Sequence, residues 1–391
     1  MPVALVLLLA LSSVIPINAR GYGAGSVCDL GRRPNTRPHS VSILEFGAVG
    51  DGKTLNTLAF QNADPSHWKV VDPLPSYGRG IDLPGKRYMS LINGDKLHDV
   101  VVTGDNGTID GQGLLWWDRR PHLVEFISSE NVVVSNLTFL NAPAYTIHSV
   151  YCSHVLIHKV TANTSPESPY TIGIVPDSSD NVCIQDCRIN MGYDAISLKS
   201  GWDEYGTSYA RPTANVQIRD VYLRAASGSS ISFGSEMSGG ISDVVVRDAH
   251  IHSSFSGIAF RTTRGRGGYI KEIDVSNVHM VNVDTAFLAN GSFGTHPDSG
   301  FDANAFPLVS HIRLRDVYGE NISVAGCFFG TKESPFTSVL LSNISLSMKN
   351  SGSSDDSWQC SYVEGSSDSV VPEPCSELES SYGIAVAFVP T

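Results

Sequence analysis

The hexapeptide NVVVSN, from Asn131 to Asn136, decides the fold because variants of it recur along the chain. Each copy begins with a polar or charged residue and carries apolar residues at its second and fourth positions. The starts lie 23 to 39 residues apart: DVVVTG from Asp99, NVVVSN from Asn131, HVLIHK from His154, NVCIQD from Asn181, NVQIRD from Asn215, DVVVRD from Asp243, EIDVSN from Glu272, HIRLRD from His311 and SVLLSN from Ser338. Repeats of this length are typical of solenoid proteins.

Apolar and polar residues alternate within each copy, as at Val244 and Val246 or at Ile312 and Leu314. A period of two indicates β-strands, and strands this short bury a core only when coils stack on one another. Helical periodicity is almost absent after residue 64, and Asn-Gly turns are too sparse for the main alternative, a β-sandwich. We therefore predict an all-β fold, a parallel β-helix that forms a single-stranded solenoid of about nine or more coils.

Four segments are expected along the 391 residues. Residues 1–19 hold a short apolar run and end on the small residue Ala19, which is typical of a cleaved signal peptide. Residues 20–45 would form an N-terminal segment, 46–350 the β-helix domain and 351–391 a C-terminal tail. A capping helix is expected to begin near Thr54 and to end at Asp64, because Pro65 follows. No membrane anchor is expected.

Sequons and cysteines favour a secreted glycoprotein. Six N-x-[S/T] sequons lie at Asn106, Asn136, Asn163, Asn290, Asn321 and Asn343. Seven cysteines leave at least one unpaired, and Cys360 with Cys375 is the expected disulfide within the tail.

The net charge of −12 excludes nucleic acid as the default partner. A polyanionic substrate would need a local basic patch, for which the candidates are Lys199, Arg261, Arg264, Arg266 and Lys271. The histidines and cysteines lack metal-ligand spacing, so neither a metal site nor another cofactor is expected.

Six longer strings carry a resemblance to a known family. They are FGAVGDGKTLNT from Phe46, VVDPLPSYGRG from Val70, NGTIDGQG from Asn106, KSGWDEYG from Lys199, GSEMSGG from Gly234 and GRGGYIK from Gly265. Together they resemble the plant polygalacturonase-like branch of glycoside hydrolase family 28, the pectinases. The resemblance implies a right-handed parallel β-helix, a secreted monomer of the cell wall, and inverting hydrolysis of the α-1,4-linked galacturonan of pectin.

Inverting hydrolysis needs a proton donor and a carboxylate base on opposite faces of the scissile bond. By the resemblance, an Asn-Thr-Asp motif and an Asp-Asp pair supply them. The first motif falls on residues 170–172, with Ile172 in place of its aspartate, and the pair falls on Tyr193 and Asp194. Asp194 is thus the one catalytic aspartate that remains of three. Asp177 lies at an odd offset from Ile172 and is not expected to replace it.

The substrate-binding residues of the family also change. Its Gly-His-Gly segment falls on residues 228–230, with Ser229 at the histidine position, and its Arg-Ile-Lys segment falls on residues 259–261 and keeps a cation at Arg261. Arg261 and Lys199 are expected to bind a galacturonate carboxylate, which suits an arginine fork, beside Ser229. Trp202 is a candidate for stacking on a sugar ring, although large aromatics more often pack at coil corners.

The join after Ala63 is shorter than in the family. Either the N-terminal cap is shortened, or the sequence lacks part of the natural chain. Two classes of function follow: a pectin hydrolase, or a noncatalytic relative that binds pectin or oligogalacturonides or is inactive. A pectate lyase would need a calcium site of clustered carboxylates on one coil, which the sequence does not indicate.

Overall fold

The structure is a computed structural model and describes residue 28 and residues 68–80, 83, 85–349 and 357–378. The expected signal peptide (1–19), the segment 20–45 apart from Cys28, and the shortened cap after Phe46 lie outside the described residues. The strands are β1 Val70–Val71, β2 Arg87–Tyr88, β3 Ile92–Asp95, β4 His98–Asp110, β5 Val124–Ile127, β6 Glu130–Leu140, β7 Tyr145–Val150, β8 Ser153–Asn163, β9 Ile172–Asp177, β10 Asp180–Met191, β11 Ile196–Leu198, β12 Thr213–Ala225, β13 Ser229–Phe233, β14 Ile241–Arg261, β15 Tyr269–Asn290, β16 Leu308–Ile322, β17 Val324–Phe329, β18 Phe336–Met348, β19 Trp358–Ser361 and β20 Val363–Val371. The described helices are short: the 3-10 turns η4 Gly113–Leu115 and η6 Ser376–Leu378, and α2 Asp203–Tyr209.

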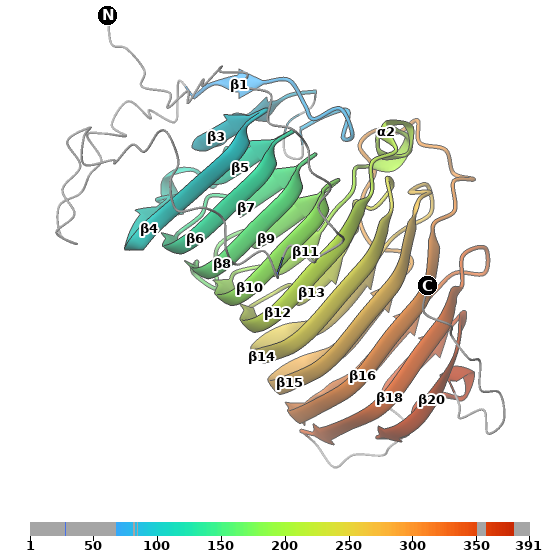
Figure 1. Cartoon of the computed structure of the whole chain (residues 1–391). Coiled ribbons are helices and arrows are strands. Elements are labelled where there is room, and N and C mark those ends of the chain that lie inside the picture. Colours follow the sequence, from blue (N-terminus) through green and yellow to red (C-terminus); the bar gives the residue numbers. More distant parts are fainter. Residues whose placement is uncertain (1–27, 29–67, 81–82, 84, 350–356, 379–391) are drawn as a thin grey trace, which may run out of the picture.

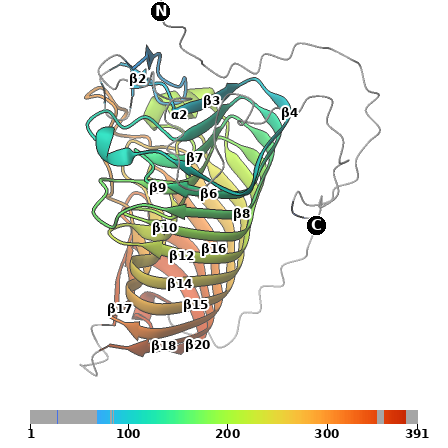
Figure 2. The same ribbon diagram turned by 90° about the vertical axis from the view of Figure 1, so that its left-hand side faces the viewer.

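The strands stack coil on coil in two parallel columns (Figures 1 and 2). One column follows the order β4, β6, β8, β10, β12, β14, β15, β16, β18 and β20. The other runs from β3 through β5, β7, β9, β11 and β13 into the second halves of β14 and β15, and ends on β17 and β19. The expected all-β, right-handed parallel β-helix is confirmed.

Both ends of the repeated hexapeptide adopt left-handed backbone conformations. In β10 the φ angles are 55° at Asn181 and 53° at Asp186, and in β14 they are 56° at Asp243 and 55° at Asp248. Positive φ is uncommon outside glycine, and Asn and Asp tolerate it best. The sequence repeat therefore records two turns of the backbone in each coil, with a strand between them.

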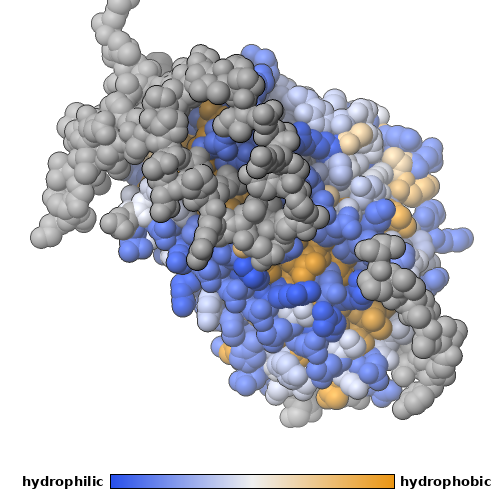
Figure 3. All heavy atoms as spheres, viewed as in Figure 1, coloured by the Kyte–Doolittle hydropathy of each residue, from blue (hydrophilic) through white to orange (hydrophobic). Residues whose placement is uncertain are grey.

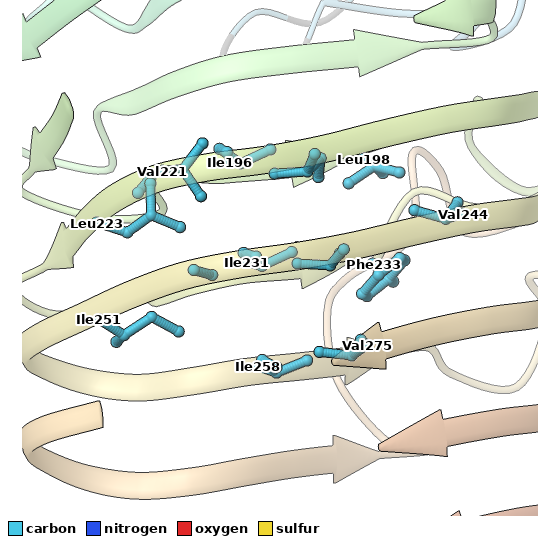
Figure 4. Close-up of a cluster of buried hydrophobic side chains, with 14 of the residues drawn as sticks. Ile196, Leu198, Val221, Leu223, Ile231, Phe233, Val244, Ile251, Ile258 and Val275 are labelled. Atoms are coloured by element: carbon cyan, nitrogen blue, oxygen red, sulfur yellow. The ribbon is translucent and has the colours of Figure 1, made fainter. Parts of the chain in front are cut away.

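Inward side chains form columns along the helix axis. One column consists of residues paired from coil to coil and at most 2% exposed: Val132, Val155, Val182, Val216, Val244, Ile273, Ile312 and Val339. Phe233 and Phe260 stack with ring centroids 4.9 Å apart, and Phe233 lies among the buried aliphatic residues of Figure 4. Burial of one such side chain contributes about 1.5–3 kcal/mol. Most of the described surface in Figure 3 is hydrophilic.

The β-helix continues past residue 350, so the expected boundary of the tail at residues 351–391 is wrong. β19 pairs with β17, and β20 pairs with β18, both in parallel. This coil carries no recognisable hexapeptide because Gly365 and Ser367 lie opposite Val339 and Leu341 of β18. Two inward apolar positions are thus lost from the pattern although the strand remains.

Two disulfides are present among the described residues. Cys360 is bonded to Cys375, the pair that we expected, and Cys28 is bonded to Cys183 of β10. The second bond closes a loop of 155 residues, and loops of this length are expected to gain several kcal/mol of stability from a cross-link.

The sequons lie on turns and outward positions. Asn106, Asn163, Asn321 and Asn343 are exposed, whereas Asn136 and Asn290 are half-buried. Glycosylation at these six sites stays a prediction. No helix within the described ranges is long and apolar enough to cross a membrane.

Candidate functional site

The residues matched to the family motifs converge on one side of three consecutive coils. Asp194 precedes β11, Ser229 begins β13 and Arg261 ends β14. Nη1 and Nη2 of Arg261 donate hydrogen bonds to Oδ2 and Oδ1 of Asp194 at 2.8 and 3.0 Å. Asp194 is 1% exposed and Arg261 4% exposed, so this is a buried, bidentate ion pair.

Two serines complete the coordination of the Asp194 carboxylate. The backbone N–H of Ser229 donates to Oδ1 at 2.7 Å, and the hydroxyl of Ser232 donates to Oδ2 at 2.9 Å. Nη2 of Arg261 also donates to Oγ of Ser229 at 2.6 Å. A carboxylate has about four acceptor sites, and four donors fill them here. Asp194 therefore has no lone pair left with which to orient a water.

Apolar and aromatic side chains occupy the other two positions that the sequence matches to family aspartates. Ile172 is 4% exposed. It packs in a cluster with Ala144, Tyr145 and Val175. Tyr193 leans on this cluster, with its ring 5.4 Å from the Arg261 guanidinium. Burial and the neighbouring Asp194 raise the pKa of Tyr193 to about 12. The site thus offers a phenol at Tyr193, the position where the sequence resemblance places a carboxylic acid.

The candidate basic patch consists largely of cations that already have partners. Lys199 is 5% exposed and paired with Glu236, and the fully buried Arg266 is paired with Asp203. Lys199 and Arg261 thus each have a carboxylate partner within the protein. Their binding of a galacturonate carboxylate stays a prediction. The sequence shows cations but not which carboxylates the coils bring opposite them.

Trp202 packs at a coil corner. It is 6% exposed, and its indole N–H donates to the carbonyl of Thr295 at 2.9 Å. Its ring is therefore not presented to solvent as a sugar-stacking platform.

The Lys199–Glu236 pair predicts a loss of stability in acid. Burial alone would raise the pKa of Glu236, but Lys199 and Arg266 lower it to about 2. A lowered pKa contributes stability above the unfolded value near 4.5, and this contribution disappears as the pH falls towards 2. We expect the free energy of unfolding, measured in urea between pH 5 and pH 3, to fall less steeply in Glu236→Gln than in the parent chain. The exposed Glu364→Gln is the control and should keep the parent slope; equal slopes for all three proteins would contradict the prediction.

A second buried polar network lies nearer the N-terminal coils and was missed in the sequence. Nδ1 of His148 lies 2.9 Å from Oε1 of Glu125, and Nε2 lies 3.2 Å from Oδ2 of Asp177. Burial opposes protonation, but the hydrogen bonds to the two carboxylates raise the pKa of His148. Arg87 binds Glu125 at 2.8 and 2.9 Å, and the Tyr77 hydroxyl donates to Asp177 at 2.5 Å. The strand register would have revealed this network, because Glu125 of β5 and His148 of β7 are paired residues on adjacent coils.

Three of these side chains could in principle hold a metal ion. Ligand atoms of His122, Glu125 and His148 lie within 4.8 Å of one another, and all three residues are buried. Both nitrogens of His148 already contact carboxylates, and Arg87 occupies both oxygens of Glu125. A cation would have to displace these contacts beside an arginine, so the residues do not fit a metal site.

The family of this chain follows from its similarity to known proteins. Residues 82–373 match the glycosyl hydrolases family 28. This chain belongs to that family. A probable polygalacturonase from Vitis vinifera is 41% identical over 398 residues, which cover 88% of this chain and 81% of the relative. Polygalacturonase-2 from Solanum lycopersicum is 25% identical, with 89% of this chain and 83% of the relative covered.

The fold is shared with solved family 28 structures. The exopolygalacturonase from Thermotoga maritima superposes with a TM-score of 0.73 at 20% identity, with 90% of this chain and 94% of the other covered. The polygalacturonase from Erwinia carotovora gives a TM-score of 0.56 at 22% identity, with 79% of each chain covered. These likenesses show the shared fold, and the 41% identity to the Vitis vinifera relative makes this chain a polygalacturonase-like member of family 28.

Family 28 chemistry requires a carboxylate free to act on water. Five carboxylates in the described ranges around this site are ion-paired: Glu125, Asp177, Asp194, Asp203 and Glu236. Glu204 of α2 differs, because its Oε2 is buried without a hydrogen-bond partner. None of the five is left over as a base or as an acid.

Proposed function

We propose that this chain binds the galacturonan of pectin and hydrolyses it far more slowly than polygalacturonases that keep all three aspartates. Family membership and the fold support the substrate class. The observation that carries the loss of hydrolysis is the occupied carboxylate of Asp194, which accepts four hydrogen bonds and lies against Arg261.

The substitutions at the other two positions support the same conclusion. Ile172 has no titratable group, and the phenol of Tyr193 has a raised pKa. An acid whose pKa lies far above the working pH is a weak donor to a leaving oxygen. The acid and base functions are therefore both compromised, while the β-helix fold of the family is retained.

The protein would act outside the cell. The apolar run before Ala19, the six sequons and the two disulfides support secretion into an oxidising compartment. The relatives bear the name polygalacturonase, which is consistent with a role in pectin.

Binding to pectin fragments tests this proposal directly. We expect the purified full chain to bind trigalacturonate in an isothermal titration at pH 5 and low salt, with affinity that falls as salt is added. A neutral β-1,4-galactan fragment of equal length is the control and should not bind. Absence of trigalacturonate binding by a chain whose circular dichroism shows folded β-structure would refute the proposal.

A further inference from the structure

A basic pocket opens beside the family site, on the N-terminal side of Tyr145. It is formed by the segment before β3, the connection from η4 to β5, and β7. Four arginines and two histidines contribute to its lining: Arg79, Arg87, Arg119, Arg120, His122 and His148. Four arginines in one pocket are unexpected in a chain of net charge −12. His122 adds no charge, because burial and the neighbouring His148 hold its pKa well below the usual value.

The carboxylates near this pocket do not cancel its charge. Glu125 is bound by Arg87 and His148, and Asp177 is bound by His148 and by the Tyr77 hydroxyl. Two carboxylates therefore face two cations within the network itself. Arg119, also in the lining, adds a positive charge that no carboxylate in the described ranges pairs with.

Arg119 is the least committed of these cations. Its guanidinium makes no hydrogen bond or ion pair with any residue in the described ranges. Arg79, by contrast, donates to the carbonyls of Gly80 and Pro297, and Arg120 donates to those of Pro169 and Tyr170. Arg87 also keeps a buried Nε without a partner. The pocket thus contains donors that only a ligand or water can satisfy.

The size of the pocket limits what can enter. Its volume is about 40 Å³, which is room for roughly three waters at 10–15 Å³ each. A carboxylate and the carbon that bears it fit this space, whereas a whole sugar ring does not. His122 and Tyr145 stack at the wall, with ring centroids 4.2 Å apart and planes 10° apart. This aromatic pair closes the wall, because Tyr145 is only 6% exposed. The arginine forks beside it suit a carboxylate.

The position of the pocket connects it to the family site. Tyr145 is paired with Ile172 across β7 and β9, and both belong to the cluster on which Tyr193 leans. A galacturonan chain lying across the coils at Ile172 would therefore reach the pocket one coil further towards the N-terminus. Strand spacing in a sheet is about 4.8 Å, so this step is of the order of one sugar unit.

We propose that this pocket binds the carboxylate of one uronate residue of a galacturonan chain, with Arg119 as its principal free ligand. The inference rests on the proposed function, because the pocket would be the place where the anionic substrate binds. Inorganic phosphate shares the negative charge of a uronate and is therefore the competing anion in the test.

Titration of the full chain with trigalacturonate, galacturonate, galactose and inorganic phosphate tests the pocket. We expect Arg119→Gln to weaken trigalacturonate binding at least about tenfold, since a lost charged hydrogen bond costs that much. The affinity of Arg119→Lys for trigalacturonate should lie between those of the parent and Arg119→Gln, because lysine keeps the positive charge but lacks the bidentate guanidinium. Arg247→Gln, at an exposed arginine of β14, is the matched control and should bind as the parent does. Galactose should not bind.

The outcomes separate the pocket from the function as a whole. If the parent binds trigalacturonate and Arg119→Gln binds equally well, the pocket is wrong and the proposed function stands. If phosphate binds as tightly as galacturonate, and with the same dependence on Arg119, the pocket is a general anion site and the uronate assignment is wrong. If the parent binds no uronate at all, both proposals fail.

Discussion

Reducing-end release from polygalacturonic acid at pH 5 is expected to be at least about 10²-fold slower than with a polygalacturonase that has aspartate at all three positions. General acid catalysis alone contributes about 10²–10⁴-fold, and Tyr193, whose pKa is about 12, cannot replace a carboxylic acid at this pH. We expect the base function to be weakened as well, because Arg261, Ser229 and Ser232 hold both oxygens of Asp194. The measurement is a reducing-sugar assay of the purified secreted chain.

Asp194→Asn serves as the internal comparison for that assay. If Asp194 takes no part in hydrolysis, a folded Asp194→Asn chain should release reducing ends at the same residual rate as the parent. Hydrolysis by the parent at a rate typical of the family, abolished in Asp194→Asn, would show that Asp194 leaves the Arg261 pair to work as a base. Circular dichroism at the assay temperature establishes that the variant is folded. The rate of the parent alone decides whether hydrolysis is slower than in polygalacturonases with all three aspartates.

The fold was predictable because the hexapeptide contains its own geometry. Its alternating apolar residues face the core, and its terminal Asn and Asp residues adopt positive φ. The six residues therefore specify both the strand and the turns that flank it. The prediction failed only where that pattern lapses. Gly365 and Ser367 replace inward apolar residues in β20. The sequence pattern therefore predicts a tail where the structure has the last coil.

The site was less predictable because its contacts join residues far apart in the chain. Asp194 and Arg261 are 67 residues apart, and their pairing depends on how many residues each coil contains. The sequence identified Asp194, Arg261 and Ser229 as neighbours of one cleft, which the structure brings together. It could not show that Arg261 would turn towards Asp194 rather than towards a ligand. Coils of unequal length likewise conceal the pairing of Glu125 with His148.

Loss of the Asp194 charge should destabilise the fold by about 3–5 kcal/mol, because a buried cation then remains without its partner. In Asp194→Asn, an amide NH2 would replace one carboxylate oxygen and would face two donors. Those donors are Arg261 together with Ser229 or Ser232, depending on which oxygen is replaced. The measurement is the free energy of unfolding in urea at pH 7. The exposed pair of Arg315 and Asp316 provides the control, since Asp316→Asn should cost less than about 1 kcal/mol.

A double-mutant cycle separates the ion pair from the general effect of disturbing the core. Arg261→Met keeps an unbranched chain of similar length beside Tyr193 and Phe293, and on its own it leaves Asp194 charged and buried. Combined with Asp194→Asn it removes both charges, and paired removal of buried charges is often nearly neutral. We therefore expect the double variant to be more stable than the sum of the single losses predicts, by at least about 1 kcal/mol. Simple additivity would mean that Asp194 and Arg261 do not stabilise one another. Both side chains could then interact with a substrate.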